Sequence, residues 1–214
     1  VSPRNVIFLL NSHIKSMSHN KTNILLVRHG QTEWNQQNRI QGHQDSPLTE
    51  LGKQQAKKVK QLLNKFEIQQ AYVSPMQRAR DTAKIILNGS SLKAKVLKDI
   101  GEINLGPWEG KTREETALSH PVEHNSFWHK PDIFNLAGAE TYDQLQQRMV
   151  NGLETIFSAN RNTNILVVSH WIAIKVALAF YKGIPISQLT DIKNPENGSF
   201  LCLSKEQNQV NITY

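Results

Sequence analysis

The sequence contains one cysteine, no long apolar run and no concentrated block of basic residues. The single cysteine, Cys202, excludes an intramolecular disulfide, and its position in an apolar run predicts a buried structural thiol. No apolar stretch approaches the roughly 20 residues that a membrane-spanning helix needs, so we expect no membrane partner. The remaining composition, with 38% hydrophobic and 20% charged residues, is typical of a soluble globular protein.

The net charge of +7 is not gathered into a nucleic-acid-binding surface. Residues 1–22 carry +3 from Arg4, Lys15 and Lys21 and contain no acidic residue, which leaves +4 for the rest of the chain. Those remaining lysines are scattered, and no basic run is interleaved with aromatic residues, so we expect no nucleic-acid partner. The same positive field would suit small phosphorylated molecules.

The first residues resemble a secretory signal only in outline. Residues 6–10 form an apolar run after Arg4, but the apolar core of such a signal usually has about 7–15 residues. Polar residues from Asn11 onward then interrupt the run. We therefore expect residues 1–20 to be a flexible extension, residues 21–214 to form a single domain, and the protein to be cytoplasmic.

Short apolar runs alternate with longer helix-like segments along the rest of the chain. The short runs are too brief for helices and are typical of strands buried on both faces of a sheet. We predict strands over 24–27, 71–73, 95–97 and 165–168, helices over 50–65, 77–87, 140–158 and 172–181, and edge strands over 200–203 and 210–213. This alternation predicts an α/β fold, a three-layer sandwich with a mainly parallel central sheet flanked by helices.

The stretch 104–138 is predicted to be irregular and lid-like, because glycines and prolines recur in it as breakers. Within it, Trp108 is expected to be a packing anchor and Glu109 a solvated loop carboxylate. His120, His124 and His129 either bind a second acidic group of a substrate or are surface residues of a flexible loop, and we favour the second interpretation.

Two histidines occupy equivalent positions in this pattern. The apolar run 24–27 is followed by Arg28 and His29, and the apolar run 165–168 is followed by a serine and His170. In open α/β sheets, ligands bind outside the carboxyl ends of the strands. A titratable side chain at that edge faces the crevice, and two of them at matching positions indicate a functional site.

A metal site and a phosphate site are the two alternatives for these histidines. Histidine is a common metal ligand, but neither residue lies in a His-x-Glu, His-x-x-x-His or Cys-x-x-Cys pattern. Arg28, a fixed cation beside His29, would repel a divalent metal. A guanidinium can instead hold a phosphate through two hydrogen bonds, and a neutral imidazole can attack phosphorus. The residues therefore favour a phosphate site.

The residues around His29 closely resemble the signature of the histidine phosphatase superfamily, which includes the cofactor-dependent phosphoglycerate mutases. Arg-His-Gly alone is a weak three-residue match. Further blocks follow in the same order and at fitting spacing, which makes the resemblance specific. The blocks that carry it are 26–35, 39–42, 45–49, 74–83, 101–110, 138–141 and 168–170.

The resemblance implies a catalytic role for five residues. His29 matches the nucleophile that becomes phosphorylated, and Glu102 matches the acid that protonates the leaving oxygen and later helps to activate water. Arg28, Arg78 and His170 match the cationic surroundings of the phosphoryl group. Phosphoryl transfer needs stabilisation of the charge on three oxygens, which these side chains can supply without a metal.

Other matching residues are implied to bind substrate. Asn35 is at a position that also contacts the phosphoryl group, as Arg28, Arg78 and His170 do. Gln41 and Gly42 would line the mouth of the site, although Gly42 could simply permit a turn. Glu140 resembles a recurrent glutamate of the family, and it could equally be a favourable acid at a helix N-terminus.

The sequence departs from the family pattern at Trp171, where a glycine usually follows the second histidine. An indole there is expected to narrow or redirect the substrate-binding pocket. Mutases of the family tend to carry Tyr-Gly after the glutamate loop, whereas the segment 103–110 resembles the phosphatase branch. That branch includes the broad-specificity, α-ribazole-phosphate and phosphoserine phosphatases.

The resemblance therefore implies a metal-independent, histidine acid-type phosphatase that hydrolyses a small phosphorylated metabolite through a phosphohistidine. It implies no metal and no cofactor. A cofactor-dependent phosphoglycerate mutase is the first alternative. The second is a non-enzymatic module that binds a phospholigand or a protein, and the presence of all five catalytic matches disfavours it. For the oligomeric state, monomer and homodimer both stay open.

Overall fold

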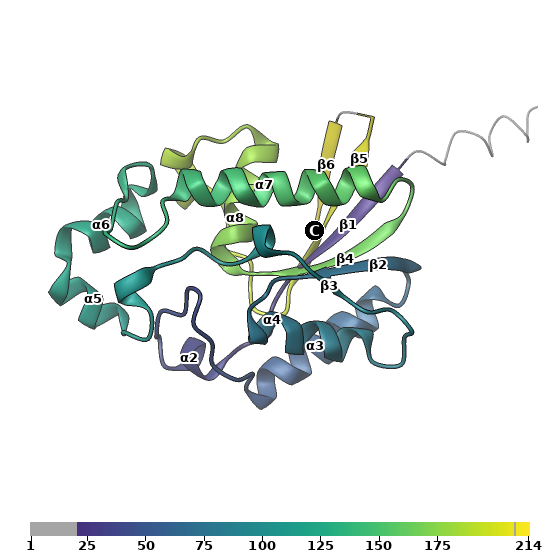
Figure 1. Ribbon diagram of the computed structural model, residues 1–214, viewed down its shortest axis with the longest axis horizontal. Helices are drawn as coiled ribbons and strands as arrows, with labels where there is room; N and C mark the ends of the chain where they lie inside the picture. The colour runs from purple at the N-terminus through teal and green to yellow at the C-terminus, as the bar shows by residue number, and fades with distance from the viewer. Residues whose placement is uncertain (1–20, 208) are drawn as a thin grey trace, which may run out of the picture.

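A computed structural model describes residues 21–207 and 209–214, so the predicted extension at residues 1–20 lies outside the described part. The described residues form one six-stranded sheet with the order β3-β2-β4-β1-β5-β6 (Figure 1). Its strands are β1 (Lys21–Arg28), β2 (Ile68–Val73), β3 (Lys95–Val96), β4 (Asn164–Ser169), β5 (Phe200–Glu206) and β6 (Gln209–Thr213).

Five of the six strands run in the same direction, and β5 alone runs against them. β1 pairs with β4, β4 with β2, and β2 with β3, all in parallel. β5 is antiparallel to β1, and β6 is antiparallel to β5. The predicted α/β fold with a mainly parallel sheet is confirmed. The prediction that 200–203 is an edge strand is wrong, because β5 hydrogen-bonds on both sides and β6 forms the edge.

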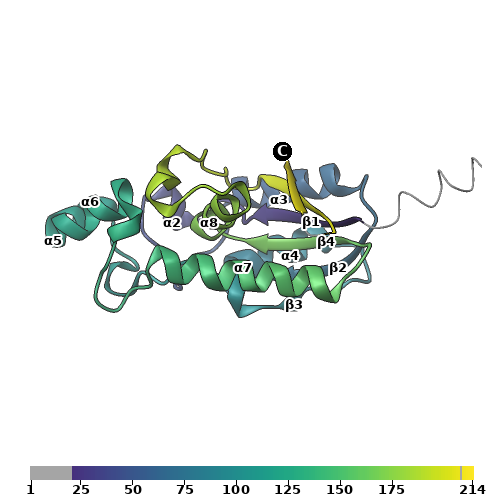
Figure 2. The same ribbon diagram turned by 90° about the horizontal axis from the view of Figure 1, so that it is seen from above.

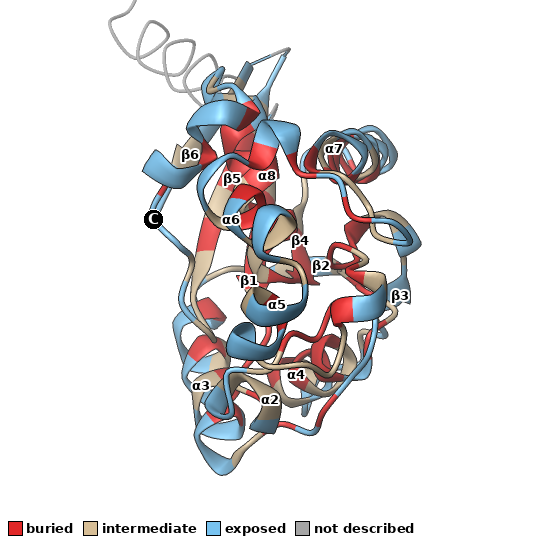
Figure 3. Cartoon of the chain, turned by 90° about the vertical axis from the view of Figure 1, so that its left-hand side faces the viewer, coloured by how far each residue is buried: buried red, intermediate tan, exposed pale blue. Residues whose placement is uncertain are grey.

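Helices cover both faces of the sheet because successive strand residues point to opposite sides. In β1, Ile24 and Leu26 belong to one apolar cluster, and Leu25 and Val27 belong to the other. The first cluster packs under α7 (Tyr142–Ala159) and α8 (Trp171–Lys182), the second under α3 (Glu50–Leu63) and α4 (Gln77–Leu87). Figure 3 shows the buried strands between the two helical layers.

The remaining elements are short helices and 3-10 turns in the segments that connect the strands and the long helices. Thr49 caps α3 as its sequence predicts, since its side chain accepts a hydrogen bond from the amide of Gly52. The short helices are α2 (Glu33–Gln36), α5 (Arg113–Ser119) and α6 (Pro121–His129), and the 3-10 turns are Lys98–Ile100, Gly106–Trp108, Pro131–Ile133 and Ile186–Asp191.

The prediction that the whole stretch 104–138 is irregular is wrong, because α5 and α6 lie in it. Thr112 and Glu115 form a capping box that starts α5. Pro121 occupies the first position of α6, where the missing N–H costs nothing, so it starts a helix instead of breaking one. We call residues 104–138 the cap. Figure 2 shows α5 and α6 beyond the end of the sheet toward which β1 and β4 point.

Three smaller expectations are settled by packing. Trp108 is a packing anchor as expected: it is fully buried and its ring lies 5.6 Å from those of Phe127 and Phe134. Glu109 is not a solvated carboxylate, because it accepts hydrogen bonds from three backbone amides of neighbouring loops. Cys202 is only half-buried on β5, so the predicted buried thiol is wrong.

Gly30 lets the loop after β1 approach α3 closely, and we expect an alanine there to destabilise the protein. A Cβ at Gly30 would lie 2.3 Å from the carbonyl oxygen of Gly52, which is backbone and cannot move aside. Overpacking of this kind costs about 1–3 kcal/mol of the free energy of unfolding. Urea unfolding of Gly30→Ala measures the loss.

Gly89→Ala is the control, because an added Cβ there meets nothing closer than 4.0 Å although its φ is +84°. That variant should lose only the roughly 1 kcal/mol that a left-handed conformation costs a non-glycine residue. A Gly30→Ala protein that is as stable as Gly89→Ala would show that the contact with α3 is not tight.

Candidate active site

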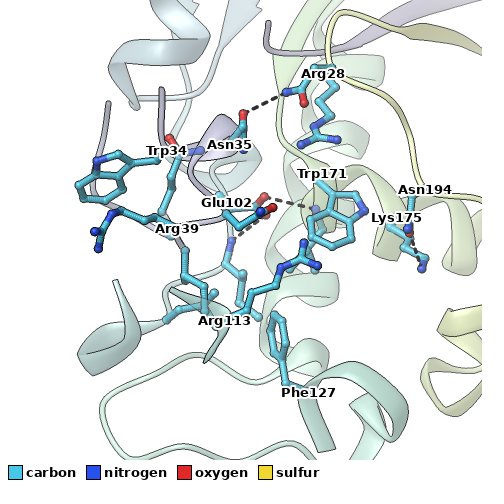
Figure 4. Close-up of a pocket in the computed structure, with 18 of the residues that line it drawn as sticks. Arg28, Trp34, Asn35, Arg39, Glu102, Arg113, Phe127, Trp171, Lys175 and Asn194 are labelled. Atoms are coloured by element: carbon cyan, nitrogen blue, oxygen red, sulfur yellow. Dashed lines mark hydrogen bonds between the residues drawn. The ribbon is translucent and has the colours of Figure 1, made fainter. Parts of the chain in front are cut away.

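A cavity of about 680 Å³ opens at the carboxyl edge of the sheet, beneath the cap (Figure 4). It collects side chains from segments far apart in the sequence. Of the predicted site residues, eight line it: Arg28, His29, Asn35, Gln41, Gly42, Arg78, Glu102 and Trp171. The ninth, His170, is fully buried beside His29, with the two ring centroids 5.1 Å apart. The structure therefore brings all nine together.

His29 directly follows β1, and its ring has a defined tautomer. Nδ1 lies 2.7 Å from the carbonyl oxygen of Gly30, which can only accept a hydrogen bond, so Nδ1 carries the proton. Nε2 is left with its lone pair. Burial lowers the pKa of His29 well below its ordinary value, and the positive charges of Arg78 and Arg28 lower it further. The ring is therefore neutral near pH 7, as a nucleophile must be.

His170 follows β4, and the parallel register of Arg28 with Ser169 places it beside His29. Its Nε2 lies 2.6 Å from the hydroxyl of Ser74. That hydroxyl also lies 3.0 Å from the sulfur of Met76, but a thioether is the weaker acceptor. We assign the Ser74 proton to Nε2, which puts the ring's own proton on Nδ1. Nδ1 is buried and has no partner among the described residues, so it is an unsatisfied donor in a ring that lies beside His29.

Arg28 and Arg78 are fixed by backbone oxygens. Arg28 donates to the carbonyl of Pro195 at 2.7 Å. Burial lowers its pKa to about 10 against the opposing field of Glu102, so it stays charged at neutral pH. Arg78 is 1% exposed and donates to the carbonyl of Gly42 at 2.7 Å and to the carboxylate of Asp45 at 2.7 Å. Both cations are held before any ligand binds.

Glu102 is 8% exposed, and its carboxyl group lies at the start of α8. Its oxygens accept hydrogen bonds from the amides of Ile172 at 3.3 Å and Ala173 at 3.1 Å, which are unpaired donors of the first helical turn. Its own carbonyl accepts from the guanidinium of Arg148 at 2.7 Å. Arg148 is held in turn by a salt bridge of 2.6 Å to Glu140. Glu140 therefore supports the loop that carries Glu102.

Asn197 belongs to the same site and was not predicted. Its side-chain amide donates to the carbonyl of His29 and to the side chain of Asn35, both at 3.2 Å. The amide of Gly198 next to it donates to the carbonyl of His29 at 3.1 Å. The only local signal is a turn-forming Asn-Gly pair before β5, so its contact with His29, which is 168 residues away, is not readable from the sequence.

Gly42 and Trp171 have structural explanations in this geometry. Gly42 has a φ of +52°, and a Cβ there would meet the carboxylate of Glu109, so the turn interpretation of Gly42 fits. Trp171 is the first residue of α8, and its ring lies against that of Trp128, with the centroids 5.8 Å apart. The guanidinium carbon of Arg28 lies 5.7 Å from the Trp171 ring.

The favoured prediction that the three histidines of the cap are surface residues of a loop is wrong in part: His124 and His129 lie on α6, whereas His120 lies in the junction between α5 and α6 and His129 is exposed. His124 is on α6, where its Nε2 accepts a hydrogen bond of 2.9 Å from the indole of Trp128. His120 packs against Trp108, with ring centroids 6.1 Å apart, and His129 lines the cavity. His124 and His120 therefore help to build the cap.

Because two histidines are buried in their neutral form, we expect the free energy of unfolding to decrease as the pH is lowered. In the unfolded chain each imidazole titrates near about 6.5, whereas in the fold burial, with Arg78, lowers the pKa of His29 and His170 well below that value. Between these pKa values the unfolded chain binds more protons. The stabilisation is complete above about pH 6.5 and is lost as the pH falls, by up to about 1.4 kcal/mol per histidine and pH unit.

Urea-unfolding free energies at several pH values from about 7.5 down to about 5 measure this loss. The double variant His29→Gln, His170→Gln lacks both imidazoles and should show a flatter dependence over the same range. Equal slopes in the variant and the unaltered protein would mean that other groups cause the acid sensitivity.

Within residues 21–207 and 209–214, no cluster of three or more His, Cys, Asp or Glu side chains is arranged to hold a metal ion. Nor does any helix of the described residues have the length and apolar character to cross a membrane.

Comparison with known proteins places this site in a family. A sequence profile of the histidine phosphatase superfamily (branch 1) matches residues 24–214. "Phosphoglycerate mutase-like protein 4" of Arabidopsis thaliana is 34% identical over 150 residues, which cover 69% of this chain and 65% of the relative. "Phosphoserine phosphatase 1" of Hydrogenobacter thermophilus is 29% identical over 184 residues, which cover 86% of this chain and 87% of the relative.

The solved structure of YhfR from Bacillus stearothermophilus superposes with a TM-score of 0.88 at 31% identity, covering 89% of this chain and 95% of that one. Profile, relatives and structure agree with the resemblance seen in the sequence. The chain belongs to the histidine phosphatase superfamily, branch 1.

Proposed function

We propose that the protein is a phosphomonoester hydrolase that acts on a small phosphorylated metabolite through a phosphohistidine at His29. The observation that carries this proposal is the free Nε2 of a neutral His29 in a cavity that also presents Arg28 and Arg78. Phosphatases among the related proteins support the same activity. No metal is needed for the steps that these side chains can perform.

In the first step, the lone pair of His29 Nε2 attacks phosphorus in line with the ester oxygen, and the phosphorus–oxygen bond of the ester breaks. Glu102, in its protonated form, gives its proton to the leaving alcohol. Arg28, Arg78 and the Nδ1–H of His170 stabilise the charge on the three remaining oxygens. The products are the alcohol and a phosphohistidine.

In the second step, water attacks the phosphorus atom, and the phosphorus–nitrogen bond breaks. Glu102, now ionised, takes a proton from the water, which restores its protonated form. Inorganic phosphate leaves. His29 returns to its neutral tautomer because Nδ1 keeps its proton in both steps, in the hydrogen bond that it donates to the carbonyl of Gly30. One carboxyl group thus serves both as acid and as base.

Hydrolysis of p-nitrophenyl phosphate and a panel of phosphorylated metabolites tests the proposal, with EDTA present and phosphate release as the readout. We expect turnover in EDTA and an acid-labile phosphohistidine on rapid quenching. A mutase would instead convert 3-phosphoglycerate to 2-phosphoglycerate when 2,3-bisphosphoglycerate is added, which a coupled enolase assay detects. Absence of turnover and of phosphohistidine with the whole panel would leave the non-enzymatic binding module as the alternative.

The lid role of the cap, the cytoplasmic location and the choice between monomer and homodimer stay predictions from the sequence. The contacts of Arg28, Arg78 and His170 with the phosphoryl group are proposed together with the reaction.

A further inference from the structure

The cavity carries more positive charge than one phosphoryl group uses. Five cationic side chains line it, and Glu102 is the only carboxylate among the described lining residues. The cations are Arg28, Arg39, Arg78, Arg113 and Lys175. Arg28 and Arg78 lie around His29 and are used by the phosphoryl group in the proposed reaction. Three cations remain on the walls farther along the cavity.

Two of these three have partners of their own. Arg39 donates to the carbonyl of Gly110 at 2.8 Å and lies 3.9 Å from the carboxylate of Glu115. Lys175 donates to the side chain of Asn194 at 2.8 Å. Both side chains therefore already bind other groups of the protein.

Arg113 has no such partner. It is the first residue of α5, and no salt bridge or hydrogen bond of its guanidinium exists among residues 21–207 and 209–214. Its guanidinium carbon lies 4.4 Å from the ring centroid of Trp128. Figure 4 shows the side chain reaching across the cavity toward Trp171. A guanidinium placed on an aromatic face and otherwise unpaired keeps its forked donors for an anion.

The two tryptophans join Arg113 to the phosphoryl-binding end. Trp128 is fixed by its hydrogen bond to His124, and its ring centroid is 5.8 Å from that of Trp171. Trp171 in turn lies 5.7 Å from the guanidinium carbon of Arg28. The contacts therefore run in the order cation, indole, indole, cation. A ligand with an anionic group at each end and a carbon skeleton between them matches that order.

We propose that Arg113 binds a second anionic group of the substrate, a carboxylate or a second phosphate, while the phosphoryl group to be transferred lies at His29. The carbon skeleton lies along Trp171 and Trp128. This inference rests on the proposed phosphatase function. It assigns the unusual Trp171 a use: the indole at this position forms the floor between the two anion sites.

Pairs of phosphomonoesters that differ by one anionic group test the proposal. 3-Phosphoglycerate and glycerol 3-phosphate share a three-carbon skeleton and differ by a carboxylate. 6-Phosphogluconate and sorbitol 6-phosphate provide the same difference on an open six-carbon skeleton, and fructose 1,6-bisphosphate and fructose 6-phosphate provide a second phosphate. We expect the acidic member of at least one pair to have a kcat/KM about tenfold to hundredfold higher, as one charge-assisted hydrogen-bonded pair supplies.

Arg113→Gln should reduce that acidic-over-neutral ratio to near one, chiefly through a higher KM for the acidic member. Arg113→Lys keeps the charge without the fork and should retain part of the ratio. Lys130→Gln is the matched control, because it removes one positive charge from an exposed residue of the cap that does not line the cavity. The control should keep the full ratio.

The outcomes separate this inference from the function on which it rests. A ratio near one for all three pairs, or a ratio that survives in Arg113→Gln, overturns the second anion site while p-nitrophenyl phosphate is still hydrolysed. If the unaltered protein hydrolyses none of the esters, the proposed phosphatase function itself is wrong. The pair that shows the preference identifies whether the second group is a carboxylate or a phosphate and how long the skeleton is.

Discussion

His29→Ala should lower the turnover of any phosphomonoester by at least about 10⁴-fold, because it removes the lone pair that attacks phosphorus in the proposed mechanism. The second histidine does not substitute for it, since the Nε2 of His170 is occupied by Ser74 and its Nδ1 is assigned the proton. Steady-state phosphate release measures the loss. Intact-protein mass spectrometry after an alkaline quench measures the missing phosphohistidine.

His120→Gln is the matched control for this variant. It removes one imidazole from the cap, outside the cavity lining, and should keep both turnover and the phosphohistidine. A thermal unfolding curve excludes a folding defect in His29→Ala. Turnover within tenfold of the unaltered protein would mean that the nucleophile is water or another side chain, and the mechanism proposed above would be wrong.

The positions of the two histidines were predictable because the signal is local. Four apolar residues before each histidine indicate a buried strand, and the structure places His29 and His170 directly after β1 and β4. What the sequence does not contain is the pairing of these two strands, which lie far apart along the chain. The register of Arg28 with Ser169 makes the two rings neighbours, and that register follows from the packing of the whole sheet.

The cap was the least predictable part for a physical reason. α6 has almost no apolar face distinct from a polar one, so helical periodicity is absent from its sequence. Pro121 acts as a helix start, yet the same residue type ends helices elsewhere. Glu109 gave a similar error, because a charged residue in a loop is usually solvated, and only the fold places three backbone amides around it.

Glu102→Gln should separate the two chemical steps. With an alkyl phosphate, whose alkoxide is a poor leaving group, loss of the proton donor should lower kcat by about 10²–10⁴-fold. With p-nitrophenyl phosphate, the phenolate leaves without a proton, so His29 should still be phosphorylated. The second step lacks its base with either ester. We therefore expect a burst of about one equivalent of p-nitrophenol followed by slow turnover, and accumulated phosphohistidine.

The glutamine can replace the carboxylate in place, because its oxygen can still accept from the amides of Ile103 and Ala173 as Oε1 of Glu102 does. Only the weaker contact with Ile172, at 3.3 Å, loses its acceptor. Glu33→Gln, an exposed carboxylate of α2 outside the cavity lining, is the control for the lost charge. Equal losses with both esters and no burst would mean that Glu102 only anchors the start of α8. A burst with one ester and a large loss with the other would require the proton transfer that the geometry suggests.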